Sequence, residues 1–281
     1  MRRSIRTAAA LALALAWAQA SAQASLCLRA PSDAPVLLHG MPNIDQAGGG
    51  AQTMLYPMPG LAGALAALAT HAAINGAMRT HEMDQLRVQA DAMLLPFQGQ
   101  LAEYTHHDLV KAALAHVNAA SAKRVAPAGT APAPGETLVD SVPAFFMTPD
   151  QRALVLENAI MVLPQGAASP YQKVIRVVSP VQPADTTVAA WFDNHAALLR
   201  RISARMLAQS VDIALADMPA AAGTEPFRTV RYPEGGVERM ERAQVIRAQC
   251  GQLVLRTLRG NLMAVPGEGD RDEAACGKGS F

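Results

Sequence analysis

Aromatic side chains and cysteines are scarce in this chain. Phe, Trp and Tyr make up 4% of its 281 residues, although 51% are hydrophobic, and there are 3 cysteines. So large a hydrophobic fraction excludes a disordered chain, and so few cysteines exclude a small fold held together by disulfides. The shortage of aromatic rings also argues against a carbohydrate-binding cleft, where rings stack on sugars.

An excess of positive charge is missing as well. Three of the 24 basic residues, Arg2, Arg3 and Arg6, lie at the N-terminus, so 21 basic residues face 23 acidic ones in the rest of the chain. Proteins that bind nucleic acids need positive charge to neutralise phosphates. The balance therefore predicts no nucleic-acid partner.

Short catalytic motifs are absent too. The segment 35–42 ends a short apolar stretch in His39-Gly40, which is similar to the oxyanion-loop strand of α/β-hydrolases, but no Gly-x-Ser-x-Gly motif occurs in the chain. There is no Cys-x-x-Cys pair for thiol redox chemistry, and Lys278 is not followed by the Ser or Thr of a phosphate loop. A pair of catalytic carboxylates stays open, because such pairs assemble from distant segments. Four carboxylates are available for it: Glu82, Asp84, Glu157 and Asp193.

The histidines do not have the spacing of metal ligands. His81-Glu82 has Gln85 where a zinc helix would carry its second histidine. His106 and His107 are adjacent, so on a helix they point in different directions. We predict neither a metal nor a cofactor.

The first 24 residues have the three parts of a secretory signal peptide. Basic residues precede an apolar stretch at 8–18, and small residues then mark cleavage sites after Ala22 or Ala24. Residues 1–24 are therefore predicted to be removed, and the mature protein is expected in the periplasm.

Export would place the cysteines in an oxidising compartment, where one disulfide and one leftover thiol are the simplest arrangement. Of the three possible pairings we favour Cys250–Cys276, which closes a loop over the C-terminal tail. Cys27 lies near the position of an acylated cysteine, but Leu26 before it is not the small residue that lipid attachment requires.

The N-terminal half is expected to hold an irregular segment and a helical region. Prolines and Gly48-Gly49-Gly50 interrupt residues 25–59, where we expect one short strand at 36–39. Residues 60–122 are predicted to be helical, and 123–137, rich in Pro, Ala and Gly, to be a linker between domains.

An uncharged Ala/Leu run at 61–78 lies within the helical region. Its length of about 18 residues is at the threshold for crossing a bilayer. We favour a buried helix in a soluble fold, and a membrane-inserted or membrane-lying helix is the alternative. His71 and Asn75 are four residues apart and share a face of this helix, so they are candidate site residues or buried polar groups.

Two further helices are predicted in the helical region. Apolar residues recur at helical spacing over 79–95, up to Pro96. Thr105 and Asp108 have the spacing of a capping box, which predicts a helix over 106–121.

Residues 138–266 are predicted to form an α+β domain, with a flexible tail at 267–281. A Thr-Pro-Asp-Gln turn at 148–151 and a hairpin turn at 232–237 separate strand-like segments. The predicted strands lie at 142–147, 153–163, 171–178, 245–248, 253–257 and 262–265.

A long helix is predicted at 188–217. At helical spacing, one face of it carries a row of apolar residues: Val188, Trp191, Phe192, Leu198, Leu199, Ile202, Met206 and Ile213. His195 falls on this face, as either a satisfied core residue or a site residue. The fold class expected is therefore α+β, with an N-terminal helical region followed by an antiparallel sheet that one long helix covers.

Six arginines gather near the C-terminus: Arg231, Arg239, Arg242, Arg247, Arg256 and Arg259. They could bind an anionic partner such as a lipid headgroup. We favour instead solvent-facing strand positions paired with Glu238 and Glu241.

The segment from Met240 through Cys250-Gly251 to Met263, and the uncharged run that precedes 86–95, resemble exported proteobacterial proteins of unassigned function. The resemblance implies export and assigns no activity. The sequence is interpreted as an exported envelope protein that binds or scaffolds, with an envelope protein or a small ligand as partner. The alternatives are a membrane-associated component that uses 61–78 and a periplasmic hydrolase.

Overall fold

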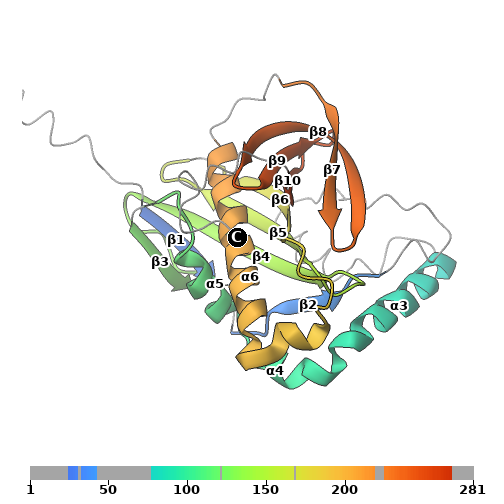
Figure 1. Ribbon diagram of the computed structural model, residues 1–281. Helices are drawn as coiled ribbons and strands as arrows, with labels where there is room; N and C mark the ends of the chain where they lie inside the picture. The colour runs from blue at the N-terminus through green and yellow to red at the C-terminus, as the bar shows by residue number, and fades with distance from the viewer. Residues whose placement is uncertain are drawn as a thin grey trace, which may run out of the picture.

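The computed structural model describes residues 25–30, 33–42, 77–120, 122–167, 169–218 and 225–267. Within these residues, ten strands form one mixed sheet, in the order β3-β1-β4-β5-β6-β10-β9-β8-β7, and β2 also pairs with β4. The long helix α6 (Val188–Asp217) crosses one face of this sheet (Figure 1). The α+β class is therefore confirmed.

The strands are β1 (Ser25–Ala30), β2 (Leu37–Gly40), β3 (Ala122–Pro127), β4 (Glu136–Met147), β5 (Leu154–Leu163), β6 (Tyr171–Val178), β7 (Arg228–Glu234), β8 (Val237–Gln249), β9 (Gln252–Thr257) and β10 (Leu262–Pro266). The helices before α6 are α3 (Ala77–Asp91), the 3-10 helix η2 (Ala92–Phe97), α4 (Gln98–Ala102) and α5 (His106–Leu114).

The sheet is mixed, so the prediction of an antiparallel sheet was wrong in this respect. β1 is parallel to both β3 and β4, β2 is parallel to β4, and β6 is parallel to β10. Parallel strands need long connections. All four of these connections include α3–α5 or α6. The prediction paired strands that are neighbours in sequence and therefore missed these crossovers.

Two segments predicted to be irregular or linking contain strands of this sheet. Ser25–Ala30, in the segment 25–59, forms β1 between β3 and β4. Most of β3 and the start of β4 lie within the predicted linker 123–137. The Pro, Ala and Gly content belongs to the connection between them, across which Arg124 pairs with Glu136 at 2.6 Å. The predicted boundary therefore does not separate two domains, because strands on both sides of it pair.

The C-terminal half follows its predicted pattern closely. β6 and α6 have the predicted bounds. The turn before β5 closes with the Gln151 amide donating to the Thr148 carbonyl at 2.8 Å. The capping box of Thr105 and Asp108 begins α5 as predicted, but α5 ends at Leu114 rather than near 121.

The main core lies between α6, α5 and the face of the sheet that they cover. Trp191, Phe145 and Leu156 are among its fully buried side chains. Buried polar groups in this core are paired across elements: the Asn158 amide donates to the Ser210 hydroxyl at 2.8 Å, and the Tyr104 and Ser203 hydroxyls lie 2.9 Å apart. Buried pairs of this kind satisfy groups that would otherwise lose hydrogen bonds to water.

A second, smaller core lies on the opposite face of the sheet. There β7–β10 curl over β5 and β6 (Figure 1). Residues of β5–β10 form the cluster: Val155, Val178, Val230, Tyr232, Ala243, Leu253, Leu255, Met263 and Val265. The curl makes β7 the end of the sheet and brings its hairpin back toward the start of β5.

α6 contains a kink that moves His195 off the face predicted for it. Asn194, His195 and Ala196 have φ of 50°, 57° and 59°, all in the left-handed region. His195 is exposed, whereas Ala196 beside it is buried. The prediction treated 188–217 as one regular helix, and the helical phase is lost at this point.

Candidate functional site

The structure does not bring the predicted site residues together. His71, Asn75 and Cys276 lie outside the described residues. His195 is exposed in the kink of α6. Cys250 lies in the turn between β8 and β9, with φ of 55°. The Cys250–Cys276 pairing therefore stays a prediction.

Cys27 is a free thiol at the centre of β1 and is completely buried. It packs with Ala126 and Leu138. Burial is the main cause that raises the pKa of this thiol, with a further contribution from Glu136. A side chain in this position has no room for an acyl chain, which argues against lipid attachment at Cys27.

The described residues hold no group of three or more His, Cys, Asp or Glu side chains that could bind a metal ion. His106, at the start of α5, is the buried histidine among them, and its Nδ1 has no hydrogen-bond partner. Burial lowers the pKa of His106, so this side chain is neutral at pH 7.

The densest set of buried charges surrounds Arg176 on β6. Its guanidinium donates to Glu234 on β7 at 2.7 Å and to Glu157 on β5 at 3.0 Å. The side chains of Arg176 and Glu234 are 5% and 4% exposed. Arg239 on β8 adds a longer ion pair with Glu234 at 3.5 Å. Four strands thus contribute to one charge network in the curl of the sheet.

Electrostatic interactions within this network keep the buried Arg176 charged. Burial opposes the charge of Arg176, but Glu234 and Glu157 outweigh that effect and raise its pKa. Burial also raises the pKa of Tyr232 to about 12, so its hydroxyl stays protonated. Glu241 has a raised pKa because it is desolvated, although Arg176 and Arg259 oppose this shift. Arg176 retains one buried donor, Nε, without a partner.

The network fixes the position of the β7–β8 hairpin over β5 and β6. Glu234 is the last residue of β7, and the turn residues Gly235 and Gly236 follow it. At the turn, the Gly236 amide donates to Asp150 at 2.5 Å. Gly235 has φ of 64°, and a side chain there would strain the backbone and collide with Asp150. The hairpin is therefore anchored at its tip as well as along its inner face.

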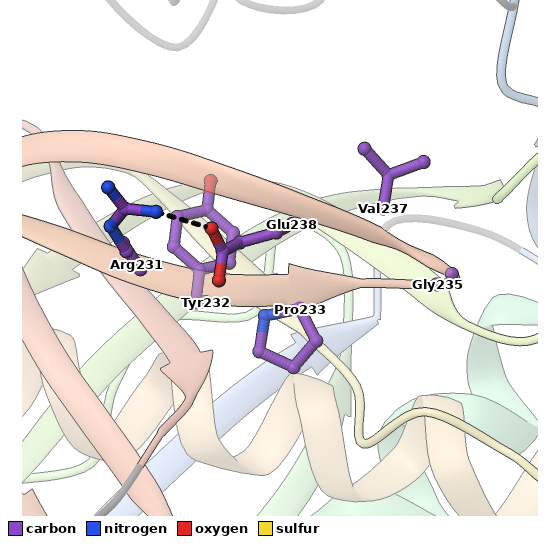
Figure 2. A pocket seen from close by; sticks show the side chains of 7 residues that line it. Arg231, Tyr232, Pro233, Gly235, Val237 and Glu238 are labelled. Atoms are coloured by element: carbon purple, nitrogen blue, oxygen red, sulfur yellow. Dashed lines mark hydrogen bonds and ion pairs between the residues drawn. The ribbon is translucent and has the colours of Figure 1, made fainter.

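The outer surface of the same hairpin carries a small hollow of about 300 Å³ (Figure 2). Residues of β7, the turn and β8 line it: Arg231, Tyr232, Pro233, Gly235, Gly236, Val237 and Glu238. Arg231 donates to Glu238 at 2.8 Å, and both side chains are more than 60% exposed. Val237 and Met240 are exposed apolar residues on the same strand, at 47% and 62%.

The predicted pairing of the arginine cluster is confirmed in part. Arg231 does pair with Glu238, but Arg239 pairs with Glu234, and Arg256 pairs with Asp217 at the end of α6 at 2.5 Å. Arg228, before this cluster, and Arg242 within it are exposed and form no ion pair with the described residues.

The sequence analysis missed Arg176 and Glu234 as partners. Glu157 stood among the available carboxylates, but nothing in the sequence links it to residues 19 and 77 positions further on. The hairpin surface offers guanidinium groups, apolar side chains and a strand edge. These groups suit binding, and the residues that line the hollow include no nucleophile beside a base.

No protein-family model matches the chain, and neither a curated protein nor a solved structure matches it. Within the described residues, no helix is both long and apolar enough to cross a membrane.

Proposed function

We propose that this protein is an exported protein of the bacterial envelope that acts by binding, and that the β7–β8 hairpin is its contact surface. One observation carries the proposal: buried ion pairs hold the hairpin from its inner side, while Met240 on its outer side and Val237 beside its turn are exposed. A rigid element with exposed apolar side chains among charged ones is suited to recognition, because little freedom is lost on binding.

Removal of residues 1–24 is compatible with the described fold. The first described strand, β1, begins at Ser25, after both predicted cleavage sites at Ala22 and Ala24. Cleavage there leaves every described strand in the mature chain. The membrane-associated alternative depends on 61–78, of which the structure describes the last two residues.

Export is tested by fractionating cells and measuring the intact mass of the native protein with and without reductant. A soluble periplasmic species that begins at Gln23 or Ser25 supports the proposal. A mass that is lower by two protons without reductant than with it would also support one disulfide, which we expect at Cys250–Cys276. A species that retains residues 1–22, or one found in the cytoplasm, would overturn the export proposal.

Binding through the hairpin is tested by photo-crosslinking in cells. A photoreactive amino acid replaces Met240 in one variant and Leu258 in another; these side chains are 62% and 61% exposed, so they are matched for access. We expect a discrete crosslinked product from position 240 and none from position 258. Equal yields from both positions, or no product from position 240, would contradict the proposal.

A further inference from the structure

β7 has a strand partner on one side only among the described residues, because it ends the sheet. Its hairpin has a two-residue loop, so Glu234 and Val237 form the closing hydrogen-bonded pair. Hydrogen-bonded and non-bonded pairs alternate in an antiparallel ladder. The backbone groups of Thr229, Arg231 and Pro233 therefore point to the open edge. Pro233 has no N–H to donate. Because its nitrogen points to the open edge, no hydrogen bond to β8 is lost.

The charges of the side chains along this edge indicate which kind of partner it can bind. Thr229, Arg231 and Pro233 share the outer face with Arg242, Met240 and Glu238, which lie opposite them on β8. Arg231 is paired with Glu238 near the turn, but Arg242 and the neighbouring Arg228 have no carboxylate partner among the described residues. The edge is therefore positively charged along its first half.

A second copy of the chain is a poor occupant of this edge. Two β7 strands that met in antiparallel register around Arg231 would place these arginines opposite each other, and like charges directly opposite destabilise a ladder. An extended segment with acidic side chains has the complementary charge. Pro233 has no amide to donate, so the added ladder would end near Arg231.

We propose that the open edge of β7 binds an extended acidic segment of another polypeptide as an added strand. This inference rests on the proposed binding function and names the chemistry of its partner. Main-chain hydrogen bonds from Thr229 and Arg231 hold the segment, and the guanidinium groups of Arg231 and Arg242 select its acidic side chains. When the acidic segment is bound, Arg231 contacts both it and Glu238, or contacts the segment in place of Glu238.

Buried contacts on the inner side of β7 hold the strand in place before a partner binds. Val230, Tyr232 and Glu234 are buried on the inner side of β7, and Glu234 is bound to Arg176. The strand therefore keeps its extended form without a partner on its open side. A preformed strand of this kind loses little conformational freedom when a further strand is added.

The test uses two synthetic peptides and the mature protein. One peptide alternates valine with glutamate, and the other alternates valine with lysine. Fluorescence anisotropy measures their affinities at low and high salt. We expect the glutamate peptide to bind at least about tenfold more tightly, with the difference shrinking at high salt. Equal affinities, or no binding of the glutamate peptide, would overturn the inference.

Two variants separate strand addition from simple charge attraction. Arg231→Glu is expected to abolish binding of the glutamate peptide, and the matched control Arg201→Glu, an exposed arginine on α6, is expected to keep it. Thr229→Pro removes one outward amide, as Pro233 already does, and should weaken binding while leaving the charges intact. Unchanged binding by both Arg231→Glu and Thr229→Pro would contradict the inference.

Amide exchange gives a readout that needs no variant. Binding of the glutamate peptide should slow exchange at the amides of Thr229 and Arg231 and leave the already bonded amides of Val230 and Tyr232 unchanged. Uniform protection, or none, would refute an added strand. The Met240 crosslink is independent of the peptide. A crosslink with no peptide binding would overturn the acidic strand alone, whereas loss of the crosslink would overturn the binding function itself.

Discussion

Arg176 on β6 and Glu234 on β7 form an ion pair of 2.7 Å between side chains that are 5% and 4% exposed. Their residues are far apart in sequence and on strands that are not neighbours in the sheet. The pair therefore holds the curl of the sheet closed across its inner face. Together with the hydrogen bond from Gly236 to Asp150, it ties the hairpin to the rest of the fold.

Removing one partner of this pair is expected to be costly. Glu234→Gln leaves Arg176 with Glu157 as its remaining carboxylate partner, in a site where Nε already has no acceptor. Breaking a buried ion pair by deleting one partner costs about 3–5 kcal/mol, whereas an exposed pair contributes about 0–1 kcal/mol. Urea unfolding of Glu234→Gln should show the large loss, and the matched variant Glu238→Gln, which breaks the exposed pair with Arg231, should show almost none. Equal losses of stability in the two variants would show that the Arg176–Glu234 ion pair does not hold the hairpin in place.

Gly40 is predicted to be required for the docking of α3. An added Cβ would collide with the carbonyl oxygen of Ala90, and the Gly40 amide donates to Asp91 at 2.7 Å. Gly40→Ala should therefore lower the free energy of unfolding. Gly99→Ala in α4, where a Cβ meets nothing within 4 Å, should leave it unchanged or raise it by about 0.5–1 kcal/mol. Thermal unfolding of both variants decides the point; a tolerated Gly40→Ala would be inconsistent with the close contact.

The stability of the sheet at acidic pH should depend on Glu136. Arg124 donates to its carboxylate at 2.6 Å and lowers the pKa of Glu136 below its ordinary value of 4.5. A carboxyl whose pKa is lowered by folding contributes stability above its unfolded pKa and loses it as pH falls through the folded pKa. The free energy of unfolding should therefore fall more steeply below pH 4.5 in the wild type than in Glu136→Gln. Parallel curves for the two proteins would show that this ion pair does not link stability to pH.

The parts of the fold that could be predicted are those set by local patterns. The capping box at Thr105, the turn at 148–151 and the bounds of β6 and α6 follow from residues close together in sequence. The insertion of β1 between β3 and β4 does not, because a stretch of six residues before a proline carries no information on its partners. The site was less predictable still: Arg176, Glu157 and Glu234 meet only once the sheet has curled.

Helical spacing predicted His195 on the apolar face of α6, but the left-handed kink exposes this side chain to solvent. The last prediction concerns the strain in this kink. Left-handed backbone in residues other than glycine costs about 1 kcal/mol or more per residue, and three such residues follow one another in α6. His195 is exposed, so His195→Gly should lose few contacts and raise the free energy of unfolding by about 1 kcal/mol.

Arg201→Gly is the matched control for this prediction. Arg201 is exposed in the regular part of the same helix, where glycine costs about 1 kcal/mol. The two substitutions should therefore shift the urea midpoint in opposite directions. If His195→Gly destabilises the protein as much as Arg201→Gly does, the kink is not strained at His195, and the histidine side chain makes a contribution that its exposure does not explain. An undiminished crosslink from position 240 in the His195→Gly variant would also show that partner binding does not depend on this histidine.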